Sequence, residues 1–183
     1  MIKKLLIADD DSGILTSLRF LLKSQPFKLT FAHSVQEVEY FVKHEQFDLV
    51  LMDLNYAKDT TSGEEGVALI KTLKTLDEDL AIVVMTGWAS IELAVTAMQQ
   101  GAGDFVQKPW DNERLISILN QQLLLAAQQQ RAKKLTAENI LLKNALGQGG
   151  NIHPVANSMA MQQLMVQLKQ FAATDISILL TGE

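Results

Sequence analysis

Five polar residues, each at the end of a short apolar run, could together bind a metal ion and a phosphoryl group. They are Asp9, Asp10, Asp53, Thr86 and Lys108. Short apolar runs separated by amphipathic stretches predict buried parallel strands. Because the carboxyl ends of parallel strands form the ligand-binding edge of an open sheet, we expect three carboxylates, one hydroxyl and one ammonium at a single rim.

Each of these residues also has an ordinary structural explanation when it is taken alone. An Asp after a strand usually caps a helix or forms a turn, which is the role expected of Asp11 or Ser12. The combination favours a functional site, because clustered carboxylates repel one another and raise each other's pKa unless a cation neutralises them. Magnesium suits such a site, with the Lys108 ammonium and the Thr86 hydroxyl available to oxygens around Asp53.

A regular alternation of strands and helices is needed to position these residues. The apolar runs predict strands at about 2–8, 28–32, 47–52, 80–86 and 104–107, and the amphipathic stretches predict helices at about 12–24, 35–45, 64–76 and 90–100, with a fifth opening near 111. Ser34 with Glu37 is a capping-box signature. Gly101 marks a helix end and Asp111 an N-cap. This pattern indicates an α/β fold with a parallel sheet, whose right-handed crossovers favour strand order 2-1-3-4-5.

Composition limits the classes of protein to consider. The chain has 183 residues, of which 48% are hydrophobic, a net charge of −5 and no cysteine. This length suits one ordinary domain with an appendage, and the charge does not suggest nucleic-acid binding by this segment. Without cysteine, disulfides, thiol catalysis and zinc–thiolate sites are excluded. The N-terminal apolar run is too short for a secretory signal or a membrane span, so we expect a soluble, cytoplasmic protein.

The rim residues and their immediate neighbours form a combination that resembles a known family: Asp9-Asp10, Asp53, Thr86-Gly87 and Lys108-Pro109. With this combination, residues 1–122 resemble the receiver domain of bacterial two-component response regulators. The resemblance implies a flavodoxin-like (βα)5 doubly wound sheet. It also implies that Asp53 is the phosphoacceptor, a carboxylate nucleophile that takes a phosphoryl group from the phosphohistidine of a sensor histidine kinase.

The same resemblance implies a magnesium site around the phosphoacceptor. Asp10 would bind Mg²⁺ directly and Asp9 through water, and Asp53 would also belong to the site. The backbone carbonyl of Asn55 would be a further ligand. The residue types agree with this assignment, because magnesium is held by carboxylates, waters and phosphate oxygens.

The remaining rim residues are expected to respond to the phosphoryl group. By resemblance, Lys108 would pair with phosphoryl oxygens, and Thr86 would turn inward to hydrogen-bond one of them. Phe105 occupies the aromatic switch position of the family, although an ordinary core or edge aromatic is the alternative. Phosphorylation should then bias the face built from the fourth helix, the fifth strand and the fifth helix.

The segment that follows the expected phosphoacceptor departs from the family pattern. A receiver usually has a short turn with Met-Pro and then Gly, whereas residues 54–66 contain no proline and form a longer connection. A tolerated surface insertion is one interpretation, since added loop length costs little. The other is a lid beside Asp53 that slows hydrolysis of the phosphorylated form, with Tyr56, Lys58 and Trp88 as its contacts.

A long helix should follow the receiver. Residues 111–146 contain neither proline nor glycine, and a heptad frame places apolar residues and one Asn at core positions, among them Ile118, Leu125, Leu135, Asn139 and Leu142. The frame predicts a coiled coil and a homodimer, because a single core Asn favours a defined register and two strands. Gln121 and Gln128 weaken its first half, and a lone solvated linker helix is the alternative.

Residues 147–183 form a third segment. Gly147 to Gly150 should break the helix, and an amphipathic helix with Ser158 or Asn157 as its cap and a strand at 175–181 should follow. This resembles the opening of the AAA+ ATPase domain of activators of sigma-54 RNA polymerase, just before a Walker A loop. Only the first glycine of that phosphate loop is present, so we expect a fragment without ATPase activity, a short natural protein being the alternative. An apolar strand without its sheet is a liability, and we expect the tail to be disordered or to pack on another copy.

Three functional classes are consistent with these features. The leading one is a phosphorylation-controlled module that dimerises and governs an ATPase, with ATP, sigma-54 RNA polymerase and enhancer DNA as partners of the longer protein. The alternative is a receiver-type dimerisation and interaction module that works without phosphorylation. An enzyme on the same scaffold is disfavoured, because Asn55 stands where a phosphatase needs an acid and no Gly-rich first loop supports flavin binding.

Overall fold

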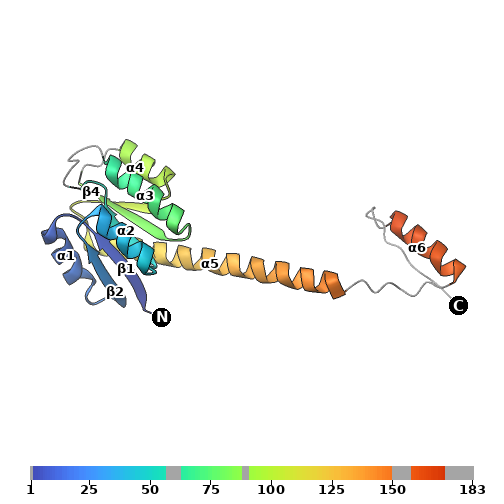
Figure 1. The fold of residues 1–183 in the computed structure, drawn as a ribbon. Helices are drawn as coiled ribbons and strands as arrows, with labels where there is room; N and C mark the ends of the chain where they lie inside the picture. The colour runs from blue at the N-terminus through green and yellow to red at the C-terminus, as the bar shows by residue number, and fades with distance from the viewer. Residues whose placement is uncertain (1, 57–62, 88–90, 150–157, 172–183) are drawn as a thin grey trace. The chain divides into compact units, whose positions relative to one another are not determined.

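The computed structural model describes residues 2–56, 63–87, 91–149 and 158–171. Its centre is one parallel sheet with the strand order β2-β1-β3-β4-β5 (Figure 1). The strands are β1 (Lys3–Ala8), β2 (Phe27–Ala32), β3 (Leu49–Asp53), β4 (Ala81–Thr86) and β5 (Asp104–Gln107). The helices are α1 (Ser12–Leu22), α2 (Val35–His44), α3 (Glu64–Leu76), α4 (Ile91–Gln99), α5 (Asn112–Gly149) and α6 (Met159–Phe171). The predicted fold class and strand order are confirmed.

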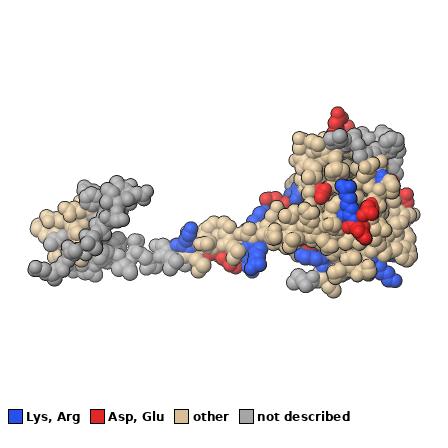
Figure 2. Space-filling model, turned by 180° about the vertical axis from the view of Figure 1, so that it is seen from behind, with Lys and Arg blue, Asp and Glu red and all other residues tan. Residues whose placement is uncertain are grey.

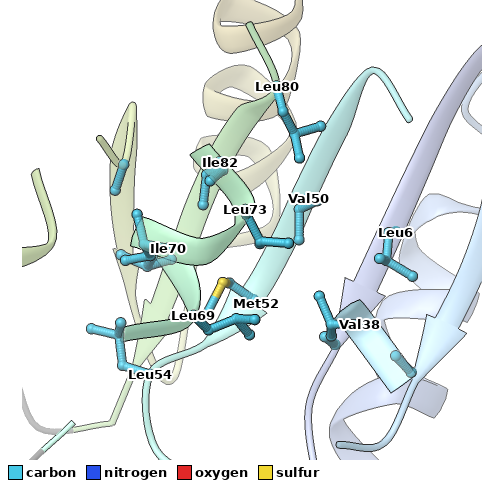
Figure 3. Close-up of a cluster of buried hydrophobic side chains, with 14 of the residues drawn as sticks. Leu6, Val38, Val50, Met52, Leu54, Leu69, Ile70, Leu73, Leu80 and Ile82 are labelled. Atoms are coloured by element: carbon cyan, nitrogen blue, oxygen red, sulfur yellow. The ribbon is translucent and has the colours of Figure 1, made fainter. Parts of the chain in front are cut away.

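Side chains of the central strands alternate between two buried clusters, one on each face of the sheet. On one face, Leu6, Val50 and Ile82 pack with side chains from α2, α3 and α4 (Figure 3). On the other, Leu5 and Leu51 pack with side chains from α1 and α5. Strands buried on both faces read as continuous apolar runs, which is why the sequence signal for β1, β3 and β4 was strong.

Polar caps set the helix ends close to the rim. The Asp11 carboxylate accepts hydrogen bonds from the backbone N–H groups of Gly13 and Ile14, so Asp11 rather than Ser12 caps α1. Asp111 Oδ1 likewise accepts from the backbone N–H of Arg114 and caps α5. These carboxylates satisfy orphan N–H groups of the first helical turn. Asp11 and Asp111 therefore have a structural role, unlike the carboxylates of the rim, which remain available to bind a ligand.

The capping box at α2 differs in one detail from the expected pattern. Ser34 Oγ accepts a hydrogen bond from the Glu37 backbone N–H at 3.3 Å. The Glu37 carboxylate, however, accepts from the backbone N–H of His33, one residue before the cap, at 2.8 Å. Two N–H groups are still satisfied reciprocally, and the entry of α2 beside the rim is held from both sides.

Helix α5 begins in the core of the α/β domain. Leu115, Leu119 and Leu123 are buried against the sheet. The chain divides within this helix into two compact units, Met1–Leu135 and Thr136–Glu183. The helix ends at Gly149 rather than at the expected residue 146. Glycine costs only about 1 kcal/mol in a helix, so Gly147 does not by itself end one.

The predicted heptad positions of α5 fall into two groups. Ile118 is 8% exposed and packs in the buried cluster on one face of the sheet, so its assignment to a coiled-coil core is wrong, because the sheet already covers it. Leu125, Leu135, Asn139 and Leu142 are exposed in the single chain. A coiled coil formed by this exposed group remains a prediction.

The second unit contains the expected amphipathic helix. Helix α6 spans Met159–Phe171, and the Met161 backbone N–H donates to Ser158 Oγ at 3.3 Å, which identifies Ser158 as its cap. The strand expected at 175–181 lies outside the described residues. The assignment of residues 147–183 to the start of an ATPase domain therefore remains a prediction.

The surface bears on the classes of partner. On the face drawn in Figure 2, acidic and basic side chains lie interspersed among neutral ones, both on the α/β domain and along α5. This mixture differs from the broad basic surface expected of a nucleic-acid interface. Among the described helices, none combines the length and the apolar character that a membrane crossing requires.

Gly66 allows the start of α3 to approach the end of β3, and this contact gives a test of the fold. A Cβ at Gly66 would lie 2.5 Å from the Leu54 carbonyl oxygen and 2.6 Å from its Cα. We expect Gly66→Ala to lower the free energy of unfolding by about 1–3 kcal/mol, because backbone must move. Gly87→Ala, with nothing within 4 Å of its Cβ, should stay within about 0.5 kcal/mol. Chemical denaturation measures both, and equal stabilities would contradict the close-contact argument.

Candidate functional site

The strand register brings the ends of the strands into one row. Ala8 of β1 lies level with Met52 of β3, and Thr86 of β4 lies level with Gln107 of β5. Backbone hydrogen bonds continue past the strand ends: Leu54 N–H donates to the Met85 carbonyl at 3.0 Å, and Lys108 N–H donates to the Thr86 carbonyl at 2.8 Å. The side chains that follow each strand therefore project from one edge.

Three carboxylates meet at this edge. Asp9, Asp10 and Asp53 each offer an oxygen, and these oxygens all lie within 4.8 Å of one another. Asp9 is fully buried and Asp53 is 5% exposed, whereas Asp10 is exposed. The cluster is thus closed behind Asp9 and open beside Asp10. A ligand approaching from solvent meets Asp10 before the buried pair.

Lys108 reaches into this cluster from the end of β5. Its Nζ donates a hydrogen bond to Asp9 Oδ2 at 2.6 Å and lies 3.2 Å from Asp53 Oδ1. The sequence placed Lys108 near Asp53 but did not identify Asp9 as its nearer partner. The Lys108–Pro109 peptide bond is cis.

Burial and the charges of neighbouring groups shift the pKa values of Asp9, Asp53 and Lys108 in opposite directions. Burial raises the pKa of Asp53 to about 6, although the charge of Lys108 opposes the shift. Burial also raises the pKa of Asp9, against its hydrogen bond with Lys108. For Lys108, burial alone would lower the pKa, but the hydrogen bond to Asp9 and the charge of Asp53 raise it above its usual range. The Lys108 ammonium therefore stays protonated, and its positive charge offsets only part of the negative charge of the carboxylates.

The donor set fits a magnesium ion. Asp53 Oδ1 is buried and makes no hydrogen bond of good geometry among the described residues, although the Lys108 ammonium lies 3.2 Å away. One ammonium cannot neutralise three carboxylates, so a cation at the cluster would relieve the excess negative charge. Carboxylate oxygens are ligands that Mg²⁺ prefers. The residues present could hold Mg²⁺ through Asp9, Asp10 and Asp53.

The structure places the remaining predicted site residues as follows. Thr86 is buried at the end of β4, and Phe105 is half-buried and packs against the cluster on the α3 and α4 face. Of the three proposed lid residues, Lys58 and Trp88 lie outside the described residues. Tyr56 is 5% exposed and belongs to that same core cluster. Tyr56 therefore contributes to the core rather than to an exposed surface, and its role in a lid remains a prediction.

Two features of the site were missed by sequence reasoning. One is the bond between Lys108 and Asp9, whose partners are 99 residues apart. The other is the burial of Tyr56, whose hydroxyl has no hydrogen-bond partner among the described residues. The position of Tyr56 three residues after Asp53 was a signal for proximity. No pattern in the sequence indicated the direction of its side chain.

The pKa of Asp53 gives a pH test. An ordinary Asp titrates near 3.8, so Asp53 binds its proton more tightly in the folded protein than in the unfolded chain. In chelator-treated protein, stability should therefore fall as pH rises from about 4 to about 6, by up to about 3 kcal/mol. Asp53→Asn should lack most of this loss and be more stable than the wild type at pH 7. Denaturation across this range checks it, and identical pH slopes would contradict burial as the cause.

Comparison with known proteins agrees with this geometry. The family model for the response regulator receiver domain matches residues 5–120. The chain is similar to the alginate biosynthesis transcriptional regulatory protein AlgB of Pseudomonas aeruginosa, with 29% identity over 181 residues that cover 98% of this chain and 37% of that protein. It is 30% identical over 179 residues to the transcriptional regulatory protein ZraR of Salmonella typhimurium, with the same coverage of both chains.

Solved structures show the same fold. The solution structure of the beryllofluoride-activated NtrC4 receiver domain dimer superimposes with a TM-score of 0.61 and 26% identity, covering 67% of this chain and 98% of that chain. The chain spans 37% of the length of the two curated relatives named above. Because the family model covers more than half of its residues, the chain belongs to the response regulator receiver domain family.

Proposed function

We propose that the chain is the phosphorylation-controlled module of a two-component system, with Asp53 as phosphoacceptor and Mg²⁺ as cofactor. The observation that carries this proposal is the placement of the Lys108 ammonium between the buried carboxylates of Asp9 and Asp53. One side of the cluster then has a fixed positive charge, and the other is open beside Asp10. That arrangement suits an anionic group bound on Asp53.

The phosphoryl donor is proposed to be the phosphohistidine of a sensor histidine kinase. A carboxylate oxygen of Asp53 attacks phosphorus, the new O–P bond forms, and the N–P bond to histidine breaks and leaves the ring nitrogen with the electron pair. Phosphoryl transfer needs alignment and charge neutralisation more than covalent help. Bound Mg²⁺ would supply positive charge to the phosphoryl oxygens. Asp53 must be ionised to attack, and a pKa of about 6 leaves it mostly ionised at neutral pH.

The phosphoryl group would redistribute the contacts of Lys108. A phosphoryl group on Asp53 would add charged oxygens that compete with Asp9 for the ammonium, so we propose that Lys108 turns toward them. Thr86, buried at the end of β4, would donate to another phosphoryl oxygen. A charge-assisted hydrogen bond contributes about 1.5–3 kcal/mol, less than the roughly 5.5 kcal/mol that a full population shift needs. Repacking near Phe105, on the α4–β5–α5 face, would contribute the remainder.

The longer protein is proposed to be an activator of sigma-54 RNA polymerase that works in the cytoplasm. AlgB and ZraR are transcriptional regulatory proteins, and their similarity extends over nearly the whole chain, α6 included. In such a protein the ATPase, the sigma-54 polymerase and enhancer DNA would be the partners downstream of α5. A homodimer is part of the proposal, and the similar NtrC4 structure is a dimer of activated receivers.

A second candidate is an interaction module that dimerises without phosphorylation. The observation in its favour is the apolar surface of α5, where Leu125, Leu135 and Leu142 are each more than 40% exposed. Exposed apolar rows at helical spacing are typical of helices that pair. Such pairing needs no group on Asp53, so the two candidates differ in whether the phosphoryl group changes the assembly.

Phosphorylation at Asp53 can be tested directly. With Mg²⁺ and a small phosphodonor such as acetyl phosphate, the wild type should gain one phosphoryl group, detected by intact-mass spectrometry and lost in acid or base as expected of an acyl phosphate. Asp53→Asn should gain none. Asp48→Asn is the matched control, because Asp48 pairs with Lys3 at the opposite end of β3, and it should be labelled like the wild type. Label on Asp53→Asn would overturn the assignment.

Assembly gives a second test. Leu142→Asp places a charge on the exposed row of α5 and should shift the chain from dimer to monomer in light scattering, by raising the dimer dissociation constant at least about tenfold. Lys143→Asp, beside the predicted core position, is the control and should remain dimeric. Repeating the measurement with beryllofluoride separates the two candidates: a dimer that is equally stable with and without it favours the phosphorylation-independent module.

A further inference from the structure

A pocket of about 310 Å³ lies next to the carboxylate cluster, between the start of α2 and the first two turns of α3. We call it the Tyr56 pocket, because the buried Tyr56 forms part of its wall. Asp10 of the cluster is also part of the wall, so the pocket and the proposed metal site share a carboxylate. Nothing in the phosphoryl-transfer proposal uses this pocket.

The polar groups of the Tyr56 pocket are rich in hydrogen-bond acceptors. Asp10, Glu39 and Glu65 supply three carboxylates, and no lysine or arginine is among the described residues that line the pocket. Glu39 already pairs with Lys43 at 3.2 Å. Asp10 and Glu65 make no side-chain ion pair within the described part of the chain. Two negative charges are therefore left for a ligand.

Tyr56 gives an independent indication that the pocket is a ligand site. Its hydroxyl is buried and has no hydrogen-bond partner among the described residues. A buried polar group without a partner costs about 1–3 kcal/mol, and such groups call for a water or ligand as an explanation. Burial, with the nearby charges of Asp53 and Asp9, raises the pKa of Tyr56, so the hydroxyl stays neutral and can accept a hydrogen bond.

The spacing of the carboxylates in the Tyr56 pocket indicates whether the pocket suits a single metal ion or a larger organic cation. Among the described residues, Asp9, Asp10 and Asp53 form the only group of three metal-ligating side chains whose ligand atoms lie within 4.8 Å of one another. Asp10, Glu39 and Glu65 are too far apart to coordinate one metal ion. An amidinium or guanidinium spreads its charge over several N–H donors and has no acceptor. The apolar side chains of Val35, Leu69 and Ala68 suit a short carbon framework behind it.

We propose that the Tyr56 pocket binds a small organic cation, an amidinium or guanidinium on an apolar stem, with Asp10 and Glu65 holding the charge. One consequence rests on the proposed function: because Asp10 belongs to both sites, a cation in the pocket lowers the affinity of the carboxylate cluster for Mg²⁺. By linkage, Mg²⁺ lowers the affinity of the pocket for the cation by the same factor. The ligand would thereby tune the phosphorylation switch.

Benzamidine is a suitable probe for the full chain, and neutral benzamide, which has the same shape, is the control. Titration calorimetry in chelator at low salt should show benzamidine binding at least about tenfold tighter than benzamide. Glu65→Gln should weaken benzamidine about five- to tenfold. Glu113→Gln, also in the first turn of a helix but outside the pocket, should change it less than about twofold. Equal binding of the two probes, or no effect of Glu65→Gln, would overturn the proposal.

Two further pairs of variants determine where benzamidine binds. Tyr56→Phe, which removes only the hydroxyl, should weaken benzamidine severalfold, and the exposed Tyr40 is the control, with Tyr40→Phe unchanged. Asp53→Asn should retain binding, since Asp53 does not line the pocket. If Asp53→Asn loses benzamidine while Glu65→Gln keeps it, the cation occupies the carboxylate cluster and the proposal is wrong. These titrations use no phosphodonor, so their outcome does not depend on whether Asp53 is phosphorylated.

The coupling between the Tyr56 pocket and the proposed Mg²⁺ site can be measured separately. The affinity of the wild type for Mg²⁺, measured with and without saturating benzamidine, should fall severalfold when the pocket is filled, because two cations then share Asp10. Asp10→Asn should remove most of this difference. Equal Mg²⁺ affinities with and without benzamidine would overturn the coupling.

Discussion

The Nζ atom of Lys108 lies 2.6 Å from Asp9 Oδ2 and 3.2 Å from Asp53 Oδ1, and the chemistry of the rim follows from this contact. Two carboxylates are held out of water, where the charged form is costly. The single ammonium offsets only part of that cost, as the raised pKa values of Asp9 and Asp53 show. The cluster is therefore short of positive charge. In the proposed function, a divalent cation would relieve that deficit, and a phosphoryl group on Asp53 would then give the ammonium a new partner.

The sheet fixes the positions of the side chains that carry these unbalanced charges. Strands β1, β3 and β4 are buried on both faces, so their register cannot slip without exposing apolar side chains. The same core also contains the start of α5. Gln122 of α5, 8% exposed, donates through Nε2 to the carbonyl of Gly103 at 3.2 Å, immediately before β5. A movement of β5, which carries Phe105 and leads to Lys108, is thus directly connected to the helix that leaves the receiver.

The unusual segment after Asp53 has a structural consequence that its length alone did not indicate. Tyr56 packs into the core and brings an unpaired hydroxyl to the wall of a pocket beside the carboxylates. Asp10, exposed and shared by the cluster and the pocket, is the point where the two can influence each other. In the proposal of an organic cation in this pocket, metal affinity at the rim would respond to that ligand through Asp10, without any change in the sheet.

The sequence by itself determined the strands, their order, the helix cap at Asp111, and the gathering of Asp9, Asp10 and Asp53 at one rim. These features follow from local periodicity and from the rule that parallel strands end at a common edge. Only the tertiary structure decided that Lys108 binds Asp9 more closely than Asp53, that Ile118 faces the sheet, and that Tyr56 is buried. Each of these depends on distances across the sheet and on how side chains fill the space between elements, and such distances have no period along the chain.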